Sequence, residues 1–556
     1  MRKKSNIRYR HYSLLLAVVL VLSLVLASCG SNSGGSSGTP SSPSGGNSSS
    51  GEAADPGAPQ YGGILRLAAG SVADTRDLIG VPWRQFPGKQ LTSVPYVESL
   101  LLSPWETSYE PWLCESYSLS DDGKFMTFKI KKGIQFHDGS DLTADVVAWN
   151  VNKWVEEGGI DAYVLGATVV GDDCIVEFSE YNNGFLLLMT SKQYGIISQE
   201  AFEKYGPEDI INHPVGTGPF IFDEQIPGQS ISFKRNDNYW QEGLPYLDGI
   251  EYVQIDDQNT ASAAISSGTG EQAVHLWSAN STQLAAPFFN NPDYNVSVIR
   301  WTLMVLYPNS VNPDGDLHNL NVRKAASLAI DRDALCTARN GGLDIDTPAY
   351  QYFPDQYLSH LPADDPSVLK PYDPEEAKQL LAGEGYSDTK KPVINMYCAT
   401  LTPGLDRDTL EAIANMLRAV GFEANTEYVD NAVQNERDFT GYDGTSVSAI
   451  ACFVNDTFTW DFHGMEPNYF MHGATWRPVE EMTPIYKAGK SSEAPEQDVL
   501  QDMHKLLLDN VFVIPLYNTA TLQVVRSYVH DLDLEDYAMQ TYARFDHAWM
   551  EVDKDK

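Results

Sequence analysis

Residues 118–157, SLSDDGKFMTFKIKKGIQFHDGSDLTADVVAWNVNKWVEE, contain the most informative local pattern of the chain. Ser120 to Gly123 form a turn signal, and apolar side chains then occupy every second position from Met126 to Ile130, as in a half-buried strand. Ile134 to Phe136 predict a second short strand, which Asp138-Gly139 ends in a turn. The stretch therefore begins as a predicted hairpin.

A helix is predicted directly after this hairpin. Thr143 is suited to the N-cap position, because its hydroxyl can accept a hydrogen bond from a free amide of the first turn. Val147, Val151, Trp154 and Val155 then fall at i, i+4, i+7 and i+8, on one face of a helix. By itself the pattern predicts a hairpin followed by an amphipathic helix.

The longer stretch Leu113 to Val151 closely resembles the signature of the family 5 solute-binding proteins of ABC importers, which bind oligopeptides, dipeptides and nickel. Phe136-His137-Asp138-Gly139 and Leu142-Thr143-Ala144 match this signature. Lys129-Ile130-Lys131 departs from it mildly, because the family often has a Leu-Arg pair there. Further matches follow in the family's order at Tyr61–Ala68, Pro214–Trp240, Asn321–Leu335, Tyr372–Tyr386 and Val511–Tyr517. The stretch Asn321–Leu335 resembles a helix of the family, so the resemblance implies one helix there.

Several of these matches also have a direct physical interpretation. Asp373-Pro374 reads as an N-cap followed by proline at the first helical position. The apolar pattern predicts a strand in PVINMYCAT, a helix through Leu410 and Leu417 that ends at Gly421, and another strand in FEANTEYV. This β-α-β alternation indicates an α/β region from Val311 to about Leu516.

The resemblance implies an α/β, periplasmic-binding-protein-like fold (type II, cluster C), with two lobes joined by a hinge and an additional inserted lobe. A ligand that contacts both sides of the hinge would stabilise a closed form, which the membrane permease recognises. The implied division is a base lobe at 61–94, 216–310 and 517–556, an inserted lobe at 95–215 and a second α/β lobe at 311–516.

The N-terminal residues predict export. Five basic residues precede a nearly continuous apolar run from Leu14 to Ala27, which is typical of a signal peptide at 1–28. Leu26-Ala27-Ser28-Cys29 resembles a bacterial lipobox, which implies cleavage before Cys29 and lipid attachment to its thiol. The alternative is an ordinary secretory signal with an incidental cysteine.

Residues 29–60 consist largely of Gly, Ser, Pro, Asn and Ala and cannot bury a core. A flexible linker of about 30 such residues spans roughly 30 Å. We therefore expect a lipidated N-terminus and disordered linker that tether a body beginning near Tyr61 to the outer face of the membrane.

Composition argues against nucleic acid as a partner. The chain has a formal charge of −37, and loss of the five basic residues of the signal would make it −42. Such a charge repels phosphate backbones. The roughly 500 residues after the linker exceed the length that a single hydrophobic core usually supports, so several lobes are expected.

No chemistry-bearing motif indicates an enzyme, a metal site or a cofactor. HExxH and a Walker loop are absent from the sequence, and its six cysteines include no CxxC pair. His137 invites interpretation as a metal ligand, but no second ligand lies at a suitable spacing, so we expect it to pack or hydrogen-bond at its turn. An exported enzyme on the same scaffold is the competing class of function.

The candidate ligand-binding residues are Trp460 and Asp461, within Thr457–Phe470. In peptide-binding relatives a carboxylate shortly after a tryptophan pairs with the α-ammonium group of the ligand, which Trp460-Asp461 resembles. Here the acid follows the tryptophan directly, and Asp461 capping a turn is an equal alternative. An oligopeptide is the expected solute, with an oligosaccharide or a nickel chelate as alternatives and an ABC permease and ATPase complex as partner.

Overall fold

The computed structural model describes the body of the protein and not its N-terminal segment. Residues 59–556 form one compact unit of the chain. The described residues are 58–69, 80–84, 92–103, 109–267, 273–279, 281–355, 357–399, 405, 407–440, 445–451, 479–492, 496–532 and 545–551.

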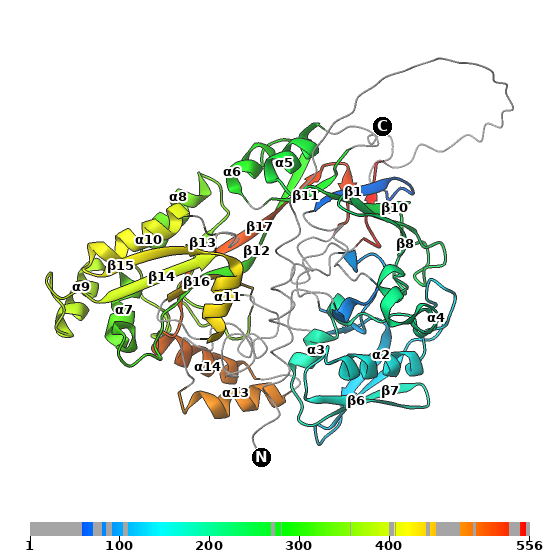
Figure 1. The fold of residues 1–556 in the computed structure, drawn as a ribbon, viewed down its shortest axis with the longest axis horizontal. Coiled ribbons are helices and arrows are strands. Elements are labelled where there is room, and N and C mark those ends of the chain that lie inside the picture. The colour runs from blue at the N-terminus through cyan, green and yellow to red at the C-terminus, as the bar shows by residue number, and fades with distance from the viewer. Residues whose placement is uncertain are drawn as a thin grey trace, which may run out of the picture. The chain divides into compact units, whose positions relative to one another are not determined.

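One long mixed sheet runs through the body, in the order β15-β14-β16-β12-β17-β11-β1-β10-β9-β8, with β13 paired to β17 (Figure 1). Its parallel pairs are β1 with β10 and β11, and β14 with β15 and β16. The strands are β1 (Ile64–Ala69), β8 (Phe220–Ile226), β9 (Ser230–Arg235), β10 (Gly249–Gln254), β11 (Leu276–Ala279), β12 (Tyr294–Tyr307), β13 (Thr347–Pro348), β14 (Val393–Ala399), β15 (Glu423–Val429), β16 (Thr445–Ala451) and β17 (Ile514–Arg526).

The stretch that predicts the fold lies in a smaller antiparallel sheet, β4-β5-β7-β6, together with α2. The predicted alternating strand is β5, and the predicted helix is α2, with the hydroxyl of Thr143 accepting a hydrogen bond from Val146 N at 3.4 Å. The elements of residues 95–215 are β2 (Leu101–Leu102) and β3 (Glu110–Pro111), which pair with each other, and β4 (Cys114–Leu119), β5 (Phe125–Ile130), β6 (Val164–Val170), β7 (Asp173–Phe178), α2 (Ala144–Glu157), α3 (Gly184–Leu188) and α4 (Gln199–Asp209).

The second strand predicted in this stretch is wrong. Residues 134–136 join no ladder, and Gln135 makes an isolated bridge to Asp141. The turn between them is so tight that Phe136 N donates to Ser140 O, with Gly139 at φ +87°. The chain therefore returns on itself before a strand can form.

The predicted β-α-β unit is present as β14, α10 and β15, with the two strands parallel. The single helix expected across Asn321–Leu335 is instead two helices, because Asp331 leaves the helical conformation and accepts a hydrogen bond from Ala334 N as the N-cap of the second. The helices of this region are α7 (Leu320–Leu328), α8 (Arg332–Asn340), α9 (Pro374–Gly383), α10 (Arg407–Ala419), α11 (Asn431–Thr440), α13 (Met482–Ser491) and α14 (Gln497–Asp509).

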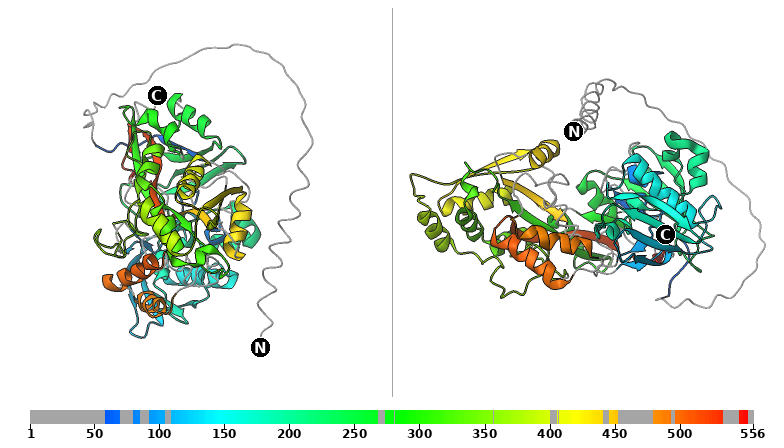
Figure 2. Two further views of the ribbon diagram at one scale, coloured as in Figure 1. Left: turned by 90° about the vertical axis from the view of Figure 1, so that its left-hand side faces the viewer. Right: turned by 90° about the horizontal axis from the view of Figure 1, so that it is seen from below.

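Near the ends of β1, β11 and β17 lie the remaining short elements (Figure 2). They are α5 (Gln258–Ser267), α6 (Thr282–Ala285), β18 (Val529–His530) and β19 (Trp549–Met550). The helices α5 and α6 contact β11, and β18 pairs with β19.

Four groups of buried apolar residues pack the body. Cluster one runs from Leu65 to Met550 and includes the buried face of α2. Clusters two and three lie on opposite sides of β12, because Met304 and Leu306 belong to one and Leu303, Val305 and Tyr307 to the other. Cluster four packs α5 and α6 against β11 and β17. The lobe boundaries given above stay a prediction.

Candidate functional site

Two long neighbouring strands, β12 and β17, connect separately packed parts of the body. They pair from Tyr294 opposite Arg526 to Leu306 opposite Ile514. The register shifts between Arg300 and Thr302 and again between Met304 and Val305. Such irregularities leave a residue unpaired and locally bend a strand. They lie where β12 passes from cluster four to clusters two and three, so this position is suited to a hinge.

A buried ion pair holds α8 against the hinge strand β17. Asp346, with 3% of its surface exposed, lies 2.6 Å from Arg339 Nε through Oδ2 and accepts a hydrogen bond from Thr519 Oγ1 at 2.8 Å through Oδ1. The guanidinium of Arg339 also lies over the ring of Tyr517, 4.7 Å from its centroid. This pair therefore determines how the hinge strand sits on the helices beyond it.

A second buried acid, Glu98, holds together segments that are far apart in sequence. Oε1 accepts hydrogen bonds from Trp112 Nε1 at 2.9 Å and Tyr239 OH at 2.8 Å, and Oε2 accepts from Thr217 Oγ1 at 2.7 Å and Trp240 Nε1 at 2.9 Å. Burial raises the pKa of the Glu98 carboxyl, while the charge of Lys192 and these donors oppose the rise. The four donors make Glu98 a structural junction.

His137 contacts the Gly-Thr-Gly segment through both its side chain and its backbone. Its Nε2 lies 2.9 Å from Gly218 O and its backbone N–H donates to Gly216 O. Because a carbonyl only accepts, Nε2 carries the proton, and burial lowers the pKa of His137 to about 4. The prediction that this histidine hydrogen-bonds at its turn is confirmed.

All three residues predicted to bind lipid or ligand lie outside the described residues: Cys29, Trp460 and Asp461. The described chain preceding Trp460 ends at Ala451 in β16, which pairs with Thr302 of β12. Thr302 in turn pairs with Thr519 of β17, directly beside the register shift. The last described residue before Trp460 and Asp461 thus lies at the hinge.

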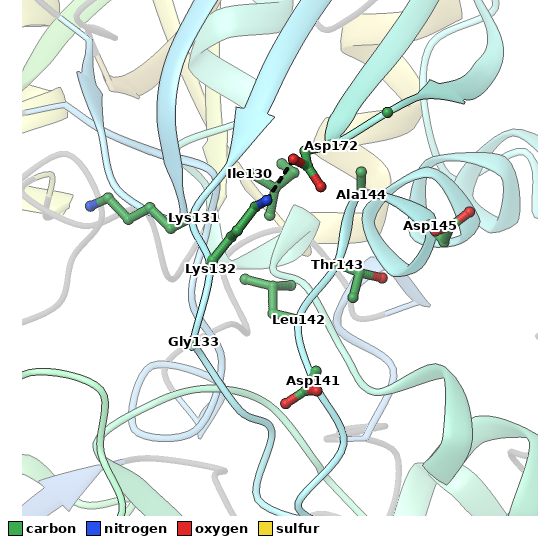
Figure 3. Close-up of a pocket in the computed structure, with 11 residues that line it drawn as sticks. Ile130, Lys131, Lys132, Gly133, Asp141, Leu142, Thr143, Ala144, Asp145 and Asp172 are labelled. Atoms are coloured by element: carbon green, nitrogen blue, oxygen red, sulfur yellow. Dashed lines mark ion pairs between the residues drawn. The ribbon is translucent and has the colours of Figure 1, made fainter.

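A hollow of about 380 Å³ opens beside the N-terminal turn of α2 (Figure 3). Its charged lining includes Lys132 and Asp172, which form an ion pair at 2.6 Å across one side. All of its lining comes from residues 130–133, 141–145 and 171–172. A solute held there would contact no residue beyond the β12–β17 hinge, so we do not assign the hollow as the solute site.

The described cysteines are buried free thiols. They are Cys114, Cys174, Cys336 and Cys398, and burial raises the pKa of each. Within the described ranges, no three histidine, cysteine or acidic side chains gather closely enough to hold a metal ion. In the same ranges no helix has the length and apolar character needed to span a bilayer.

Comparison with protein families decides the relationship. Residues 108–463, more than half of the chain, match the bacterial extracellular solute-binding proteins, family 5 (middle region). The chain belongs to this family. The match contains the decisive stretch, the hinge strand β12 and the Trp460-Asp461 pair.

Sequence relatives of this family 5 protein include the glutathione-binding protein GsiB of Salmonella paratyphi A. It is 29% identical over 389 residues, which are 67% of this chain and 71% of that protein. Matches to GsiB of Salmonella choleraesuis and Salmonella typhi span little more than half of those proteins, 53% in each case.

Solved structures of other binding proteins share the fold. The periplasmic binding protein DppA of Helicobacter pylori, in complex with the peptide STSA, has a TM-score of 0.70 at 17% identity, covering 88% of this chain and 99% of that one. NikA of Brucella suis, in complex with Fe(III)-EDTA, has a TM-score of 0.75 at 20% identity, covering 88% and 100%. The predicted α/β periplasmic-binding-protein fold is confirmed.

Proposed function

We propose that this protein is a lipid-anchored extracytoplasmic receptor that captures an oligopeptide, closes on it about the β12–β17 hinge and delivers it unchanged to an ABC permease. The observation that carries the proposal is the hinge itself. Two strands with register shifts join parts whose apolar clusters are separate. This construction permits one part to rotate against the other while each keeps its core.

The choice of a peptide rests on the relatives and on Asp461. GsiB is named for glutathione, which is itself a tripeptide with a free α-ammonium group, and the DppA structure contains a peptide. An ammonium that loses water in a closed cleft is compensated by a short charge-assisted hydrogen bond to a fixed carboxylate. We assign that carboxylate to Asp461 and a packing face for the ligand to Trp460.

Calorimetric titration tests this assignment, using trialanine, N-acetyl-trialanine and reduced glutathione against wild type and Asp461→Asn. Loss of the carboxylate leaves a buried cation unpaired, so the affinity for the free-amine ligands should fall by roughly 30-fold to several thousand-fold. The N-acetylated peptide has no charge there and should lose far less affinity. Equal affinity of both proteins for trialanine would remove Asp461 from the site.

The same titration distinguishes the other solute classes. NikA, with a chelated metal, shows that this fold also accommodates chelates. Binding of nickel-EDTA or cellotriose with no response to any peptide would contradict the peptide assignment and keep the receptor function. A sugar should be indifferent to Asp461→Asn and sensitive to Trp460→Ala, which removes a stacking face. Conversion of any solute to a product would instead indicate an enzyme.

Anchoring is tested with Cys29→Ser. The linker separates Cys29 from the body, so the variant should fold normally and leave the membrane fraction. Wild type should incorporate labelled fatty acid. A variant that stays with membranes, or a wild type that takes up no label, would contradict the lipid anchor.

A further inference from the structure

Asn183 connects two parts of the body that lie on different sides of the hinge. Its Nδ2 donates to Gly489 O at 2.9 Å and to Ser492 O at 3.0 Å, and its backbone N–H donates to Lys490 O at 3.0 Å. Only 1% of the Asn183 surface is exposed. These contacts join residues about 300 positions apart, and α3 and the end of α13 lie close together in Figure 1.

The two partners belong to separately packed cores. Asn183 immediately precedes α3, whose Phe185 and Leu186 are part of cluster one. The acceptors lie at the C-terminal end of α13, whose Met482 and Tyr486 are part of cluster three. Rotation about β12 and β17 that separates these clusters must break all three hydrogen bonds.

The side chain of Asn183 is not used by its own helix. It occupies the N-cap position of α3, where asparagine commonly accepts a hydrogen bond from the first turn, yet it makes no capping bond. Asn182 supplies that acceptor instead, receiving a hydrogen bond from Gly184 N at 3.0 Å. The amide of Asn183 is thereby oriented toward α13.

The end of α13 needs such donors. The last carbonyls of a helix have no partner within the helix, and side-chain donors or water must satisfy them. Ser492 N approaches Gly489 O at 3.4 Å, a long hydrogen bond. Asn183 provides two side-chain donors and one backbone donor to this end, so a residue of one lobe caps a helix of the other.

We propose that Asn183 is a latch that favours the closed conformation by capping the C-terminus of α13 across the hinge. The inference rests on the proposed function, because it assumes capture by closure. Both sides of the latch are protein, so its contribution is the same for every solute. Since a solute binds the closed form best, weakening the latch lowers the apparent affinity through the population of that form.

Three variants test the latch. Asn183→Ala removes both side-chain hydrogen bonds, each worth about a factor of 2 to 12 in an equilibrium constant, so the closed-to-open equilibrium constant should fall roughly 5- to 100-fold. Asn183→Asp keeps the size of the side chain but places a negative charge against helix C-terminal carbonyls, and should open the protein further. Lys490→Ala is the matched control, because the acceptor at this residue is its backbone carbonyl.

The readouts are the hydrogen-exchange protection of the residue 183 amide, with and without trialanine, and the trialanine affinity. We expect protection in wild type and Lys490→Ala, a roughly 5- to 100-fold smaller protection in Asn183→Ala, and the least in Asn183→Asp. The affinity should fall in proportion to the closed fraction, and therefore by less than the protection for as long as the closed form predominates. An amide that is unprotected in wild type in both conditions, or equally protected in wild type and Asn183→Asp, overturns the latch.

A failure of the proposed function would give a different pattern of results from a failure of the latch. If no variant binds trialanine but ligand-free wild type is protected and Asn183→Asp is not, the latch stands and the peptide assignment fails. If trialanine binds equally to all variants with unchanged protection, the receptor function stands and the latch fails.

Discussion

The inserted lobe and the second α/β lobe are each joined to the base by two crossings of the chain, within the predicted boundaries, but the two joints are built differently. At the inserted lobe, cluster one includes residues on both sides of the predicted boundary, from Leu65 of β1 through α2 to Met550. At the second lobe no single cluster continues along the connecting strands: clusters two and three cover β12 from Leu303 to Tyr307, and cluster four, which Ile345 joins, packs the part of β17 beyond the register shift. We therefore expect continuity of the core, rather than the number of crossings, to decide which joint moves.

Polar contacts reinforce this difference. Glu98 receives donors from Thr217, Tyr239 and Trp240 across the first joint. At the second joint, Asp346 receives a hydrogen bond from the hinge strand through Thr519, beyond the register shift. We therefore expect changes at Glu98 to affect stability alone, and changes at the hinge to affect stability and solute binding together.

The largest effect is expected for Glu98→Ala. It leaves four buried donors without an acceptor and opens a cavity, so the free energy of unfolding should fall by about 3–5 kcal/mol. Urea denaturation measures the loss. Glu98→Gln, which keeps the volume and one oxygen, is the control and should lose less. If the free energy of unfolding of Glu98→Ala lies within about 1 kcal/mol of the wild-type value, this joint does not depend on the carboxylate.

Asp346→Asn should come next. It leaves the guanidinium of Arg339 without its charge partner, at a cost of about 3 kcal/mol in stability, and should also change the affinity for trialanine, because the hinge strand is held less firmly. Asp344→Asn is the matched control: its ion pair with Arg300 is 3.2 Å long and Asp344 is 88% exposed. An exposed pair is worth at most about 1 kcal/mol. Equal effects of both variants would contradict a role of Asp346 at the hinge.

These two acids also show where prediction from sequence stops. Thr143 and the apolar face of α2, and the β-α-β unit from Val393 to Val429, depend on neighbours within a few residues and are predicted correctly. The donors to Glu98 lie up to 142 positions away, and nothing in VESLLL distinguishes this acid from others. Asn183 meets its acceptors about 300 positions away. Local patterns cannot indicate such partners.

The same limit applies to the division of one predicted helix into α7 and α8. The residues around Asp331 are compatible with one continuous helix, yet Asp331 serves as the N-cap of α8. Its neighbour Arg332 donates to Pro515 O at 2.7 Å, within the hinge strand β17. The break in the helix is thus determined by where the tertiary structure needs that arginine.

A pH dependence tests the second lobe separately. His504 is fully buried, accepts a hydrogen bond from Tyr352 N through Nε2 and donates to Ser359 O through Nδ1. Burial lowers the pKa of His504 to about 4, below its usual value of about 6.5. Between these two pH values the unfolded chain binds a proton that the folded chain does not. The free energy of unfolding should therefore decrease as the pH is lowered through that window, by up to about 3 kcal/mol.

Urea denaturation at several pH values measures this dependence. In His504→Gln the slope between pH 6.5 and pH 4 should be shallower by up to one proton, whatever the stability of the variant at neutral pH. An unchanged slope would show that His504 is not the group that titrates. Because His504 lies outside cluster one, the exchange of amides in α2 should not share this pH dependence beyond the contribution of His137.

The smallest expected effects compare two helix caps, one in each part. Asp373 accepts from Glu375 N at 3.1 Å and Glu376 N at 2.9 Å at the start of α9, whereas Thr143 accepts one hydrogen bond of 3.4 Å at the start of α2. Replacement of either by alanine should cost about 1 kcal/mol of stability, and Asp373→Ala should cost more than Thr143→Ala.

The informative measurement is which part of the structure is destabilised. Since α9 packs in cluster two and α2 in cluster one, native-state hydrogen exchange should accelerate in α9 and α10 for Asp373→Ala and in α2 and β5 for Thr143→Ala. Acceleration that spreads equally through both parts in either variant would mean that the body opens as one cooperative unit, and that the hinge does not separate two cores.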